Sequence, residues 1–271
     1  MKKSIIILQD LSCFTKASIN ISLPILEAMG ADSAVLPLTL LSTQSDGFDE
    51  LYVKDLSDEC VEVVSQFEKN GFVFDGFLSG YLSAERQYEV ANKAMKLLKS
   101  DAVRIIDPVL GDDGALYPGF TMNHVRLMRR YIENASVITP NWTEACMLTE
   151  KSDIDGILDA FSAMTPASVV ITSVRHEKGK ISTVVSGNGE TKIFTQRDLG
   201  ASVPGSGDLF ASVLAGKLLS GDDLFSAAFH ASEVTSLAIR KTLESGRTRR
   251  FGIDIAAALR EVSHEGACTV L

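Results

Sequence analysis

Residues 203–210, Val-Pro-Gly-Ser-Gly-Asp-Leu-Phe, bring together residue types that can handle an anion. Gly205 and Gly207 permit a tight backbone turn and leave no Cβ to block a ligand. Apolar residues recur at helical spacing from position 209 onward, so a helix begins near Ser206 or Gly207. The first N–H groups of a helix lack partners within it and carry the positive end of its dipole. This turn therefore predicts a pocket for an anion such as a phosphoryl group.

Asp208 falls in the first turn of that helix, where two roles are open. Beside a bound phosphoryl group, its carboxylate could accept the proton of an attacking alcohol, which makes it a candidate general base. Alternatively, it stabilises the helix N-terminus through the helix dipole, as acidic residues there often do. The local sequence favours neither role over the other.

Several other chemical motifs are absent from the sequence. There is no P-loop signature, no G-x-G-x-x-G after the first apolar run and no H-E-x-x-H. Pro204 stands at the first glycine position of a G-x-S-x-G nucleophile elbow, which excludes that motif. The cysteines are dispersed and form no C-x-x-C pair, and they are Cys13, Cys60, Cys146 and Cys268. A hydrolase interpretation therefore lacks a nucleophile and base in a recognisable arrangement.

The charge balance limits the partners of the chain. Its 271 residues include 26 Lys and Arg against 35 Asp and Glu, a formal charge of −9. Such a surface repels nucleic acid and anionic membranes, so neither is expected as a partner. The apolar run at residues 5–8 is too short for a signal peptide, and no stretch is long enough to span a bilayer. We predict a cytoplasmic protein with reduced thiols.

Short runs rich in Ile and Val alternate with amphipathic stretches along the first two thirds of the chain. The predicted strands are residues 5–8, 34–41, 73–78, 103–107, 136–139 and 168–172. The predicted helices are residues 17–29, 55–70, 84–98, 123–133, 155–164, 209–219, 224–239 and 253–262. This alternation indicates right-handed crossovers on a mostly parallel α/β sheet. Residues 181–185 and 191–195 flank a Gly-Asn-Gly turn and predict a β-hairpin.

The ends of the predicted strands carry polar residues. In parallel sheets ligands bind outside the carboxyl ends of the strands, so these residues are site candidates. They are Gln9 and Asp10, residues 42–45, residues 79–81, residues 107–113, residues 139–141, and Thr172 with Ser173. No Pro/Ser-rich linker divides the chain, and we expect one domain over residues 1–271.

Residues 205–208, Gly-Ser-Gly-Asp, resemble the G-T-G-D anion-hole signature of the ribokinase-like superfamily. Residues 107–112 (DPVLGD) and 138–145 (ITPNWTEA) are similar to D-P-V-[LM]-G-D and I-T-P-N-x-x-E-A of its vitamin-kinase branch. Residues 78–81 (LSGY) and 170–173 (VITS) are similar to L-T-G-Y and V-[IV]-T-S. The match in order and spacing covers essentially the whole chain and is closest to the pyridoxal kinases. The resemblance implies a ribokinase-like three-layer sandwich with helices on both faces of a central, mostly parallel sheet.

The resemblance also implies residue roles. Asp208 would be the catalytic base, with the backbone of Gly205, Ser206 and Gly207 as the anion hole. The implied ATP-binding residues are Asp107, Asp112, Thr139, Asn141, Thr172 and Ser173. The implied ligands of Mg²⁺ and its waters are Asn141, Glu144 and Asp112, and a monovalent cation (K⁺) would lie beside Asp107 and Asp112. Another interpretation of Glu144 is a solvated first-turn residue after Asn141, itself a good helix N-cap.

The implied substrate-binding residues are Asp10, Ser12, Ser45 and Tyr81, together with Asp208. Two segments depart from the family pattern, since Gln44-Ser45 stands where a His-Thr pair is usual and Gln9-Asp10 where Q-S-H is common. Tyr81 could stack on a pyridine ring or simply pack in the core.

The implied activity is ATP-dependent phosphorylation of the 5'-hydroxymethyl group of pyridoxal, pyridoxine or pyridoxamine. Two alternatives stay open: a hydroxymethylpyrimidine or other small-alcohol kinase of the same superfamily, and a non-catalytic nucleotide- or vitamer-binding protein. Residues 176–201 would form a flap over ATP, and the resemblance implies a homodimer.

Overall fold

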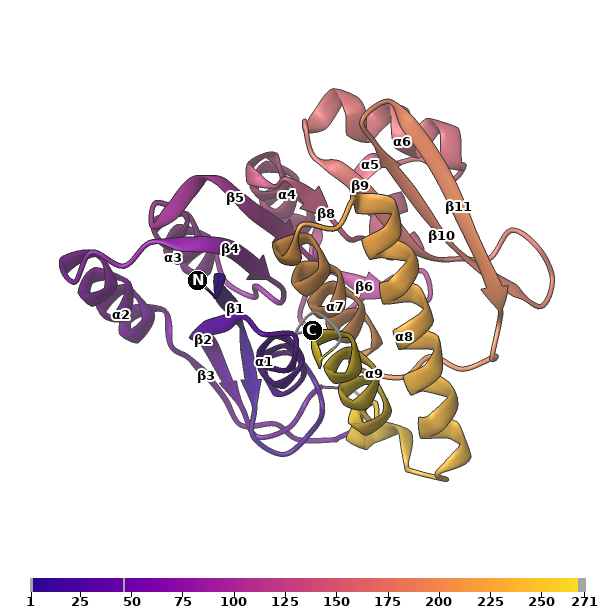
Figure 1. Ribbon diagram of the computed structural model, residues 1–271, viewed down its shortest axis with the longest axis horizontal. Coiled ribbons are helices and arrows are strands. Elements are labelled where there is room, and N and C mark those ends of the chain that lie inside the picture. The colour runs from indigo at the N-terminus through magenta and orange to yellow at the C-terminus, as the bar shows by residue number, and fades with distance from the viewer. Residues whose placement is uncertain (1, 46, 268–271) are drawn as a thin grey trace.

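A nine-stranded sheet forms the centre of the molecule in the computed structural model, which describes residues 2–45 and 47–267 (Figure 1). Its strands are β1 (Ser4–Ser12), β2 (Asp32–Leu41), β3 (Val53–Asp55), β4 (Phe74–Ser79), β5 (Leu98–Ile106), β8 (Val137–Ile138), β9 (Ser168–Val174), β10 (Lys180–Gly187) and β11 (Glu190–Arg197). A separate two-stranded sheet consists of β6 (Gly111–Asp112) and β7 (Ala115–Leu116).

The strands follow the order β11-β10-β9-β8-β5-β4-β1-β2-β3. The six strands from β9 to β2 are parallel, and β3, β10 and β11 join the edges in antiparallel pairing. All six strands predicted from the Ile- and Val-rich runs are confirmed, as is the hairpin, which is β10 and β11. Because the six parallel strands run the same way, their polar carboxyl ends meet at one edge of the sheet.

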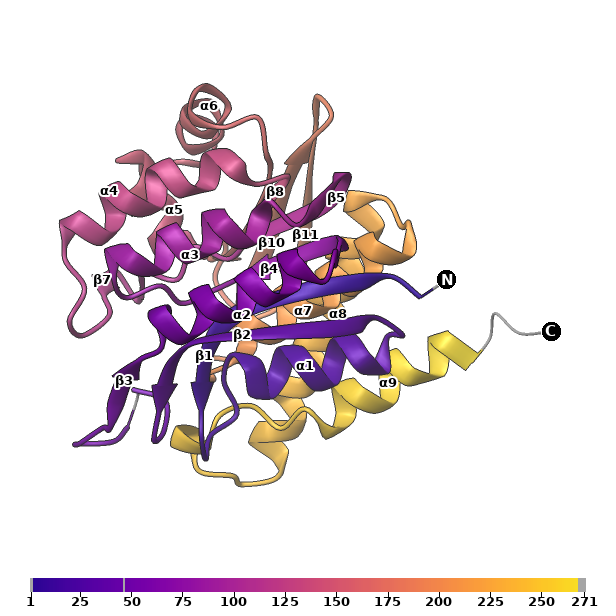
Figure 2. The ribbon, with the colours of Figure 1, turned by 90° about the vertical axis from the view of Figure 1, so that its left-hand side faces the viewer.

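Helices cover both faces of the sheet (Figure 2). One face carries α1 (Ile19–Ala28), α7 (Ser206–Ser220), α8 (Leu224–Glu244) and α9 (Ala256–Ala267). The other carries α2 (Ser57–Lys69), α3 (Glu85–Met95), α4 (Met122–Tyr131), α5 (Trp142–Thr149) and α6 (Ile154–Met164). In β1, Ile5 and Ile7 belong to the first core while Ile6 and Leu8 belong to the second. A strand buried on both faces is continuously apolar, which explains the run at residues 5–8. The predicted three-layer sandwich is confirmed.

Some elements were not predicted from the sequence. Helix α5 is only 8 residues long and β3, β6 and β7 have two or three, too few for a periodic pattern. Cys268 lies outside the described residues, and the other three cysteines are free thiols. In the described part of the chain, no helix is both long and apolar enough to cross a membrane.

Asp75 lies near the start of β4, at the edge of the sheet opposite the polar carboxyl ends of the strands. Its Oδ1 accepts hydrogen bonds from Lys99 Nζ (2.8 Å) and Lys3 Nζ (3.2 Å), and its Oδ2 accepts the Ser4 N–H (3.0 Å). Burial alone would raise the pKa of Asp75, but these donors outweigh it and hold the pKa below its usual range. The ionised carboxylate therefore joins β1, β4 and β5.

We expect Asp75→Ala to lower the free energy of unfolding by about 1.5–3 kcal/mol at pH 7, the range for hydrogen bonds to charged groups. A group with a lowered pKa contributes stability above its unfolded pKa, so the difference from wild type should shrink as pH falls below about 4. Urea unfolding at pH 7 and at about pH 3, below the ordinary pKa of the carboxyl group, measures this. Asp32→Ala, which removes an exposed pair with Lys2, is the control and should have a smaller effect. Equal losses for the two variants would contradict the role of Asp75.

Candidate active site

The carboxyl ends of the parallel strands open into a cavity of about 890 Å³. Every residue to which the family resemblance assigned a role lies on its wall, whereas the strand-end candidates Gln9, Ser42, Thr43, Ser79 and Gly80 do not line it. The residues with an assigned role are Asp10, Ser12, Ser45, Tyr81, Asp107, Asp112, Thr139, Asn141, Glu144, Thr172, Ser173, Gly205, Ser206, Gly207 and Asp208. These residues come from seven separate segments of the chain, so the structure brings together what the motifs had only suggested.

The turn at Gly205 begins α7 and faces this cavity. Gly205 has a φ of 87°, and a Cβ there would lie 2.5 Å from the Ile21 side chain and 2.7 Å from the Lys16 carbonyl oxygen. Only glycine fits such a position. Ser206 donates its N–H to the Val203 carbonyl and Leu209 donates to Gly205, which leaves the N–H groups between them available to an anion. The geometry fits the predicted anion pocket.

Asp208 does not cap its own helix, because α7 has no side-chain cap. Its Oδ2 instead accepts the Ser18 N–H (2.9 Å) and its Oδ1 accepts Gln9 Nε2 (3.3 Å). Burial raises the pKa of Asp208 to about 8, the Ser18 N–H opposes the rise, and the charges of Asp107 and Asp10 add to it. The raised pKa makes the Asp208 carboxylate a stronger base than an ordinary one, and it acts as a base only in its ionised form, which a nearby cation favours.

Gln9 and Ser18 are site residues whose contact with Asp208 the sequence did not reveal. Gln9 is fully buried, and its Oε1 has no hydrogen-bond partner among the described residues. Ser18 precedes α1 with a φ of 49°, and its hydroxyl donates to Asp10 rather than capping the helix. The sequence analysis placed Ser18 inside the predicted helix at residues 17–29, whereas it lies before α1. No local signal indicates a contact with a residue 190 positions away.

Two further carboxylates lie in the cavity wall near Asp208. Asp107 is buried and accepts the Thr139 hydroxyl (3.2 Å), and burial raises its pKa to about 7. Glu144 is also buried, and its pKa is well above the usual value because of burial first and the charge of Asp107 second. The cavity therefore concentrates negative charge, and a cation entering it would relieve the repulsion.

Asn141 and Glu144 form a capping box at the start of α5. The Asn141 side chain accepts the Glu144 N–H (2.9 Å), and Glu144 Oε2 accepts the Asn141 N–H (2.8 Å). Glu144 Oε1 also accepts the Leu110 N–H (3.0 Å), while Asn141 Nδ2 donates to the Gly111 carbonyl (2.8 Å). Glu144 is thus not the solvated residue of the alternative interpretation. The pair holds the loop that carries Asp112 against the cavity.

The donor set suits Mg²⁺ chemically, because carboxylate and amide oxygens are the ligands that this ion prefers. No three Asp, Glu, His or Cys side chains within residues 2–45 and 47–267 form a group that could hold a metal by themselves. Such an arrangement is compatible with an ion that keeps several waters and binds substrate phosphates, as Mg²⁺ does.

The opposite side of the cavity carries the residues assigned to substrate binding. Asp10 is buried, accepts the Ser12 hydroxyl (3.2 Å), and has a pKa raised by burial. The Tyr81 ring is stacked on Phe120 (5.4 Å between centroids, 23° between planes) and lines the cavity, while Ser45 is exposed. Carboxylate, hydroxyl and aromatic groups are the kinds needed to bind a small polar ring.

The sandwich and the anion pocket beside a buried carboxylate define a small-molecule kinase of ribokinase-like fold. The Phosphomethylpyrimidine kinase family matches residues 26–251, and the chain belongs to this family. The expected kinase activity, an ATP-dependent phosphotransferase, and the expected fold are therefore confirmed.

Similar proteins include pyridoxal kinases. A crystal structure of pyridoxal kinase from Lactobacillus plantarum has a TM-score of 0.91 and 31% identity, with 98% of this chain and 99% of its own covered. A Bacteroides thetaiotaomicron protein, described as a phosphomethylpyrimidine kinase and crystallised with pyridoxal, has a TM-score of 0.90 and 33% identity, covering 97% of this chain and 96% of its own. Pyridoxal kinase of Arabidopsis thaliana is 26% identical over 264 residues, 86% of this chain and 84% of its length.

Proposed function

We propose that the chain transfers the γ-phosphate of ATP to the 5'-hydroxymethyl group of a vitamin B6 vitamer, giving the 5'-phosphate. The similarity to pyridoxal kinases along nearly the whole chain supports this assignment. The observation that carries it is the position of Asp208, a buried carboxylate in the first turn of α7, beside an anion pocket and within the main cavity.

In this proposal the N–H groups of the Gly205 turn bind the transferring phosphoryl group. Asp208, oriented by Ser18 and Gln9, takes the proton of the substrate hydroxyl as it attacks in line. The vitamer lies on the side of Asp10, Ser12, Ser45 and Tyr81. The nucleotide lies toward Asp107, Asp112, Thr139, Asn141, Thr172 and Ser173.

Mg²⁺ bound with ATP would be held near Asp112, Asn141 and Glu144, and would neutralise charge on the phosphate oxygens. A monovalent cation such as K⁺ would lie beside Asp107 and Asp112. The acidic wall of the cavity supports both proposals, because its carboxylates repel one another without a counter-charge.

The segment 176–201 contributes to the nucleotide side. Its strands β10 and β11 are fixed in the main sheet, so the part free to cover ATP is the end of β11 and the loop after it. Residues 196–199 and Ala201 line the cavity, and Asp198 pairs with Arg175 (2.8 Å). We propose that this loop shields the phosphates from water. We also propose the homodimer that the resemblance implies, which light scattering would detect as twice the 29.2 kDa of one chain.

A substrate panel tests the function. With ATP, Mg²⁺ and K⁺, the protein should phosphorylate pyridoxal, pyridoxine or pyridoxamine far faster than hydroxymethylpyrimidine or ribose. The family to which the chain belongs makes hydroxymethylpyrimidine the specific competitor. Preferential phosphorylation of hydroxymethylpyrimidine would make this alcohol the substrate in place of the vitamers. If no alcohol on the panel leads to ADP release, the result would support a non-catalytic binding protein.

The pH dependence follows from the pKa of Asp208, which is about 8. The base acts only when ionised, so kcat/KM for the alcohol should rise about tenfold per pH unit below this value and level off above it. In the pH profile of kcat, measured at saturating ATP and Mg²⁺, the rising part should lie at lower pH, because a nearby cation favours the ionised form of Asp208. Initial rates from pH 5.5 to 9.5 measure both profiles. A flat kcat/KM across that range would contradict the assigned base.

A further inference from the structure

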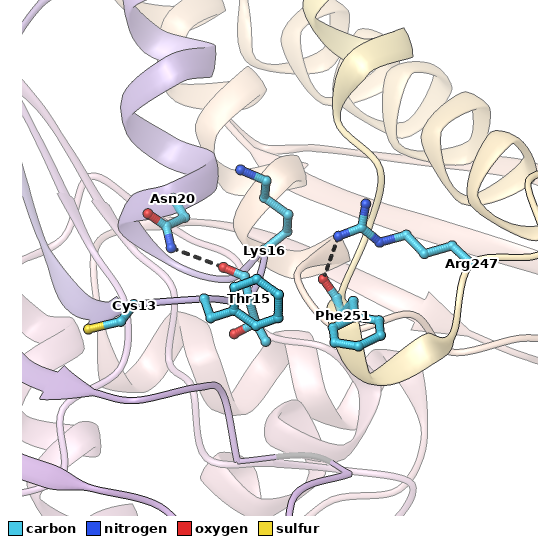
Figure 3. Close-up of a pocket in the computed structure, with 7 residues that line it drawn as sticks. Cys13, Thr15, Lys16, Asn20, Arg247 and Phe251 are labelled. Carbon is cyan, nitrogen blue, oxygen red and sulfur yellow. Dashed lines mark hydrogen bonds between the residues drawn. The ribbon is translucent and has the colours of Figure 1, made fainter.

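A second cavity of about 610 Å³, whose lining residues are drawn in Figure 3, shares no lining residue with the catalytic one. It is formed between the loop that joins β1 to α1 and the segment between α8 and α9. Its lining residues are Cys13, Phe14, Thr15, Lys16, Asn20, Arg247 and Phe251. None of them belongs to the site proposed for phosphoryl transfer, so the cavity needs an explanation of its own.

The apolar part of this cavity is aromatic. Phe14 is 70% exposed, and its ring meets Phe251 edge to face with 5.8 Å between centroids and 84° between planes. Covering this exposed phenyl ring with an apolar part of a ligand would remove apolar surface from water, which favours binding. Because the two rings are nearly perpendicular, a planar aromatic ligand could stack on the face of one ring and contact the edge of the other.

The charged part of the cavity is cationic and unpaired. Among the described residues, neither the Lys16 ammonium nor the Arg247 guanidinium forms an ion pair. Arg247 donates one hydrogen bond to the Phe251 carbonyl (3.1 Å), which leaves its other N–H groups free for a ligand. In Figure 3 the Lys16 and Arg247 side chains both lie above the Phe251 ring. In a chain with a formal charge of −9, two cations that line one cavity without acidic partners favour an anionic ligand there.

The backbone around the cavity is held in place before any ligand arrives. Lys16 donates its N–H to the Phe251 carbonyl (3.2 Å), and Asn20 Nδ2 donates to the Thr15 carbonyl (3.0 Å). Gly252 packs so closely on Lys16 that a Cβ there would lie 2.2 Å from the Lys16 carbonyl oxygen. A preorganised wall reduces the entropy that binding must offset. The same loop continues to Ser18, whose N–H binds Asp208.

We propose that this cavity is a second ligand site and that it binds an aromatic phosphate monoester. The phosphate would lie between Lys16 and Arg247, where charge-assisted hydrogen bonds are strong, and the ring would cover Phe14. If the proposed function holds, the reaction product is a molecule of this class, so the site would bind product beside the loop that positions the base. That last consequence rests on the proposed function, whereas the binding site itself does not.

Phenyl phosphate is the probe, titrated calorimetrically into the full chain in the presence of ADP and Mg²⁺. We expect Lys16→Gln/Arg247→Gln to weaken phenyl phosphate binding by about tenfold or more, because both charge-assisted contacts are lost. The control Lys69→Gln/Lys96→Gln removes the same charge from exposed positions on and after other helices and should bind like wild type. Phe14→Ala should weaken binding of phenyl phosphate but leave that of inorganic phosphate unchanged.

Several outcomes would overturn the site: equal affinity for inorganic phosphate and phenyl phosphate, equal weakening in the control variant, or no effect of the Lys16 and Arg247 changes. Burial of Phe14 between two copies of the chain, shown by a monomer–dimer shift in Phe14→Ala, would do so too. The substrate panel separates the two proposals. If phenyl phosphate binds normally but no vitamer is phosphorylated, the proposed function is wrong and the proposed site stands. If a vitamer is phosphorylated but phenyl phosphate does not bind, only the proposed site is wrong.

Discussion

Asp208→Asn is expected to lower kcat by about three to four orders of magnitude, toward the upper end of what a general base contributes. The amide has nearly the shape of the carboxyl group and its oxygen can still accept the Ser18 N–H, so the turn at Gly205 should stay intact. ATP affinity should change by no more than a few-fold, because the anion pocket consists of backbone N–H groups. Stopped-time product assays and ADP titration measure the two quantities. Wild-type turnover in a folded variant would remove Asp208 from the mechanism.

The same variant should be more stable than wild type at alkaline pH. The pKa of Asp208 is about 8 in the folded chain against an ordinary value of 3.8, so the folded state binds this proton more tightly. Its contribution to stability is complete below the ordinary pKa and is lost as pH rises through about 8. An asparagine does not ionise and avoids that loss. The Tm of Asp208→Asn should therefore exceed that of wild type by more at pH 8.5 than at pH 5, and a pH-independent difference would contradict the raised pKa.

Gly205→Ala is expected to abolish most activity and to destabilise the fold. The new Cβ would lie 2.5 Å from Ile21 and 2.7 Å from the Lys16 carbonyl oxygen, and φ would have to stay at 87°. Left-handed backbone costs a non-glycine residue roughly 1–2 kcal/mol, and the collisions add to this. Relief of the strain must move the turn, and with it the N–H groups that face the cavity. Thermal unfolding and kcat measure the two effects.

Gly207→Ala is the matched control for that experiment. A Cβ at Gly207 has nothing closer than Asp107 Oδ2 at 3.8 Å, so the fold should tolerate it. The methyl group would nevertheless point into the cavity where the phosphoryl group is proposed to lie. We expect near wild-type Tm with a raised KM for ATP or a lowered kcat. Similar Tm values for both alanine variants would show that the Gly205 turn is not strained.

Much of this protein could be predicted from residue order alone. The Ile- and Val-rich runs predicted all six parallel strands, because strands buried on both faces need continuous apolar sequence. The polar residues after those runs predicted the cavity, because the carboxyl ends of parallel strands share one edge. The glycines at 205 and 207 predicted the turn at the start of α7, where Gly205 has a φ of 87°, and the anion pocket assigned to this turn stays a prediction.

Only the tertiary structure decided which side chains touch. Ser18 and Gln9 bind Asp208 because α1 and α7 pack side by side on one face of the sheet, which no local pattern records. Glu144 is buried in a capping box because α5 docks against the loop at residues 110–111. The second cavity exists because the segment before α9 crosses the loop after β1. Local sequence sets backbone preference and polarity, whereas contacts between distant residues depend on how the helices pack on the sheet.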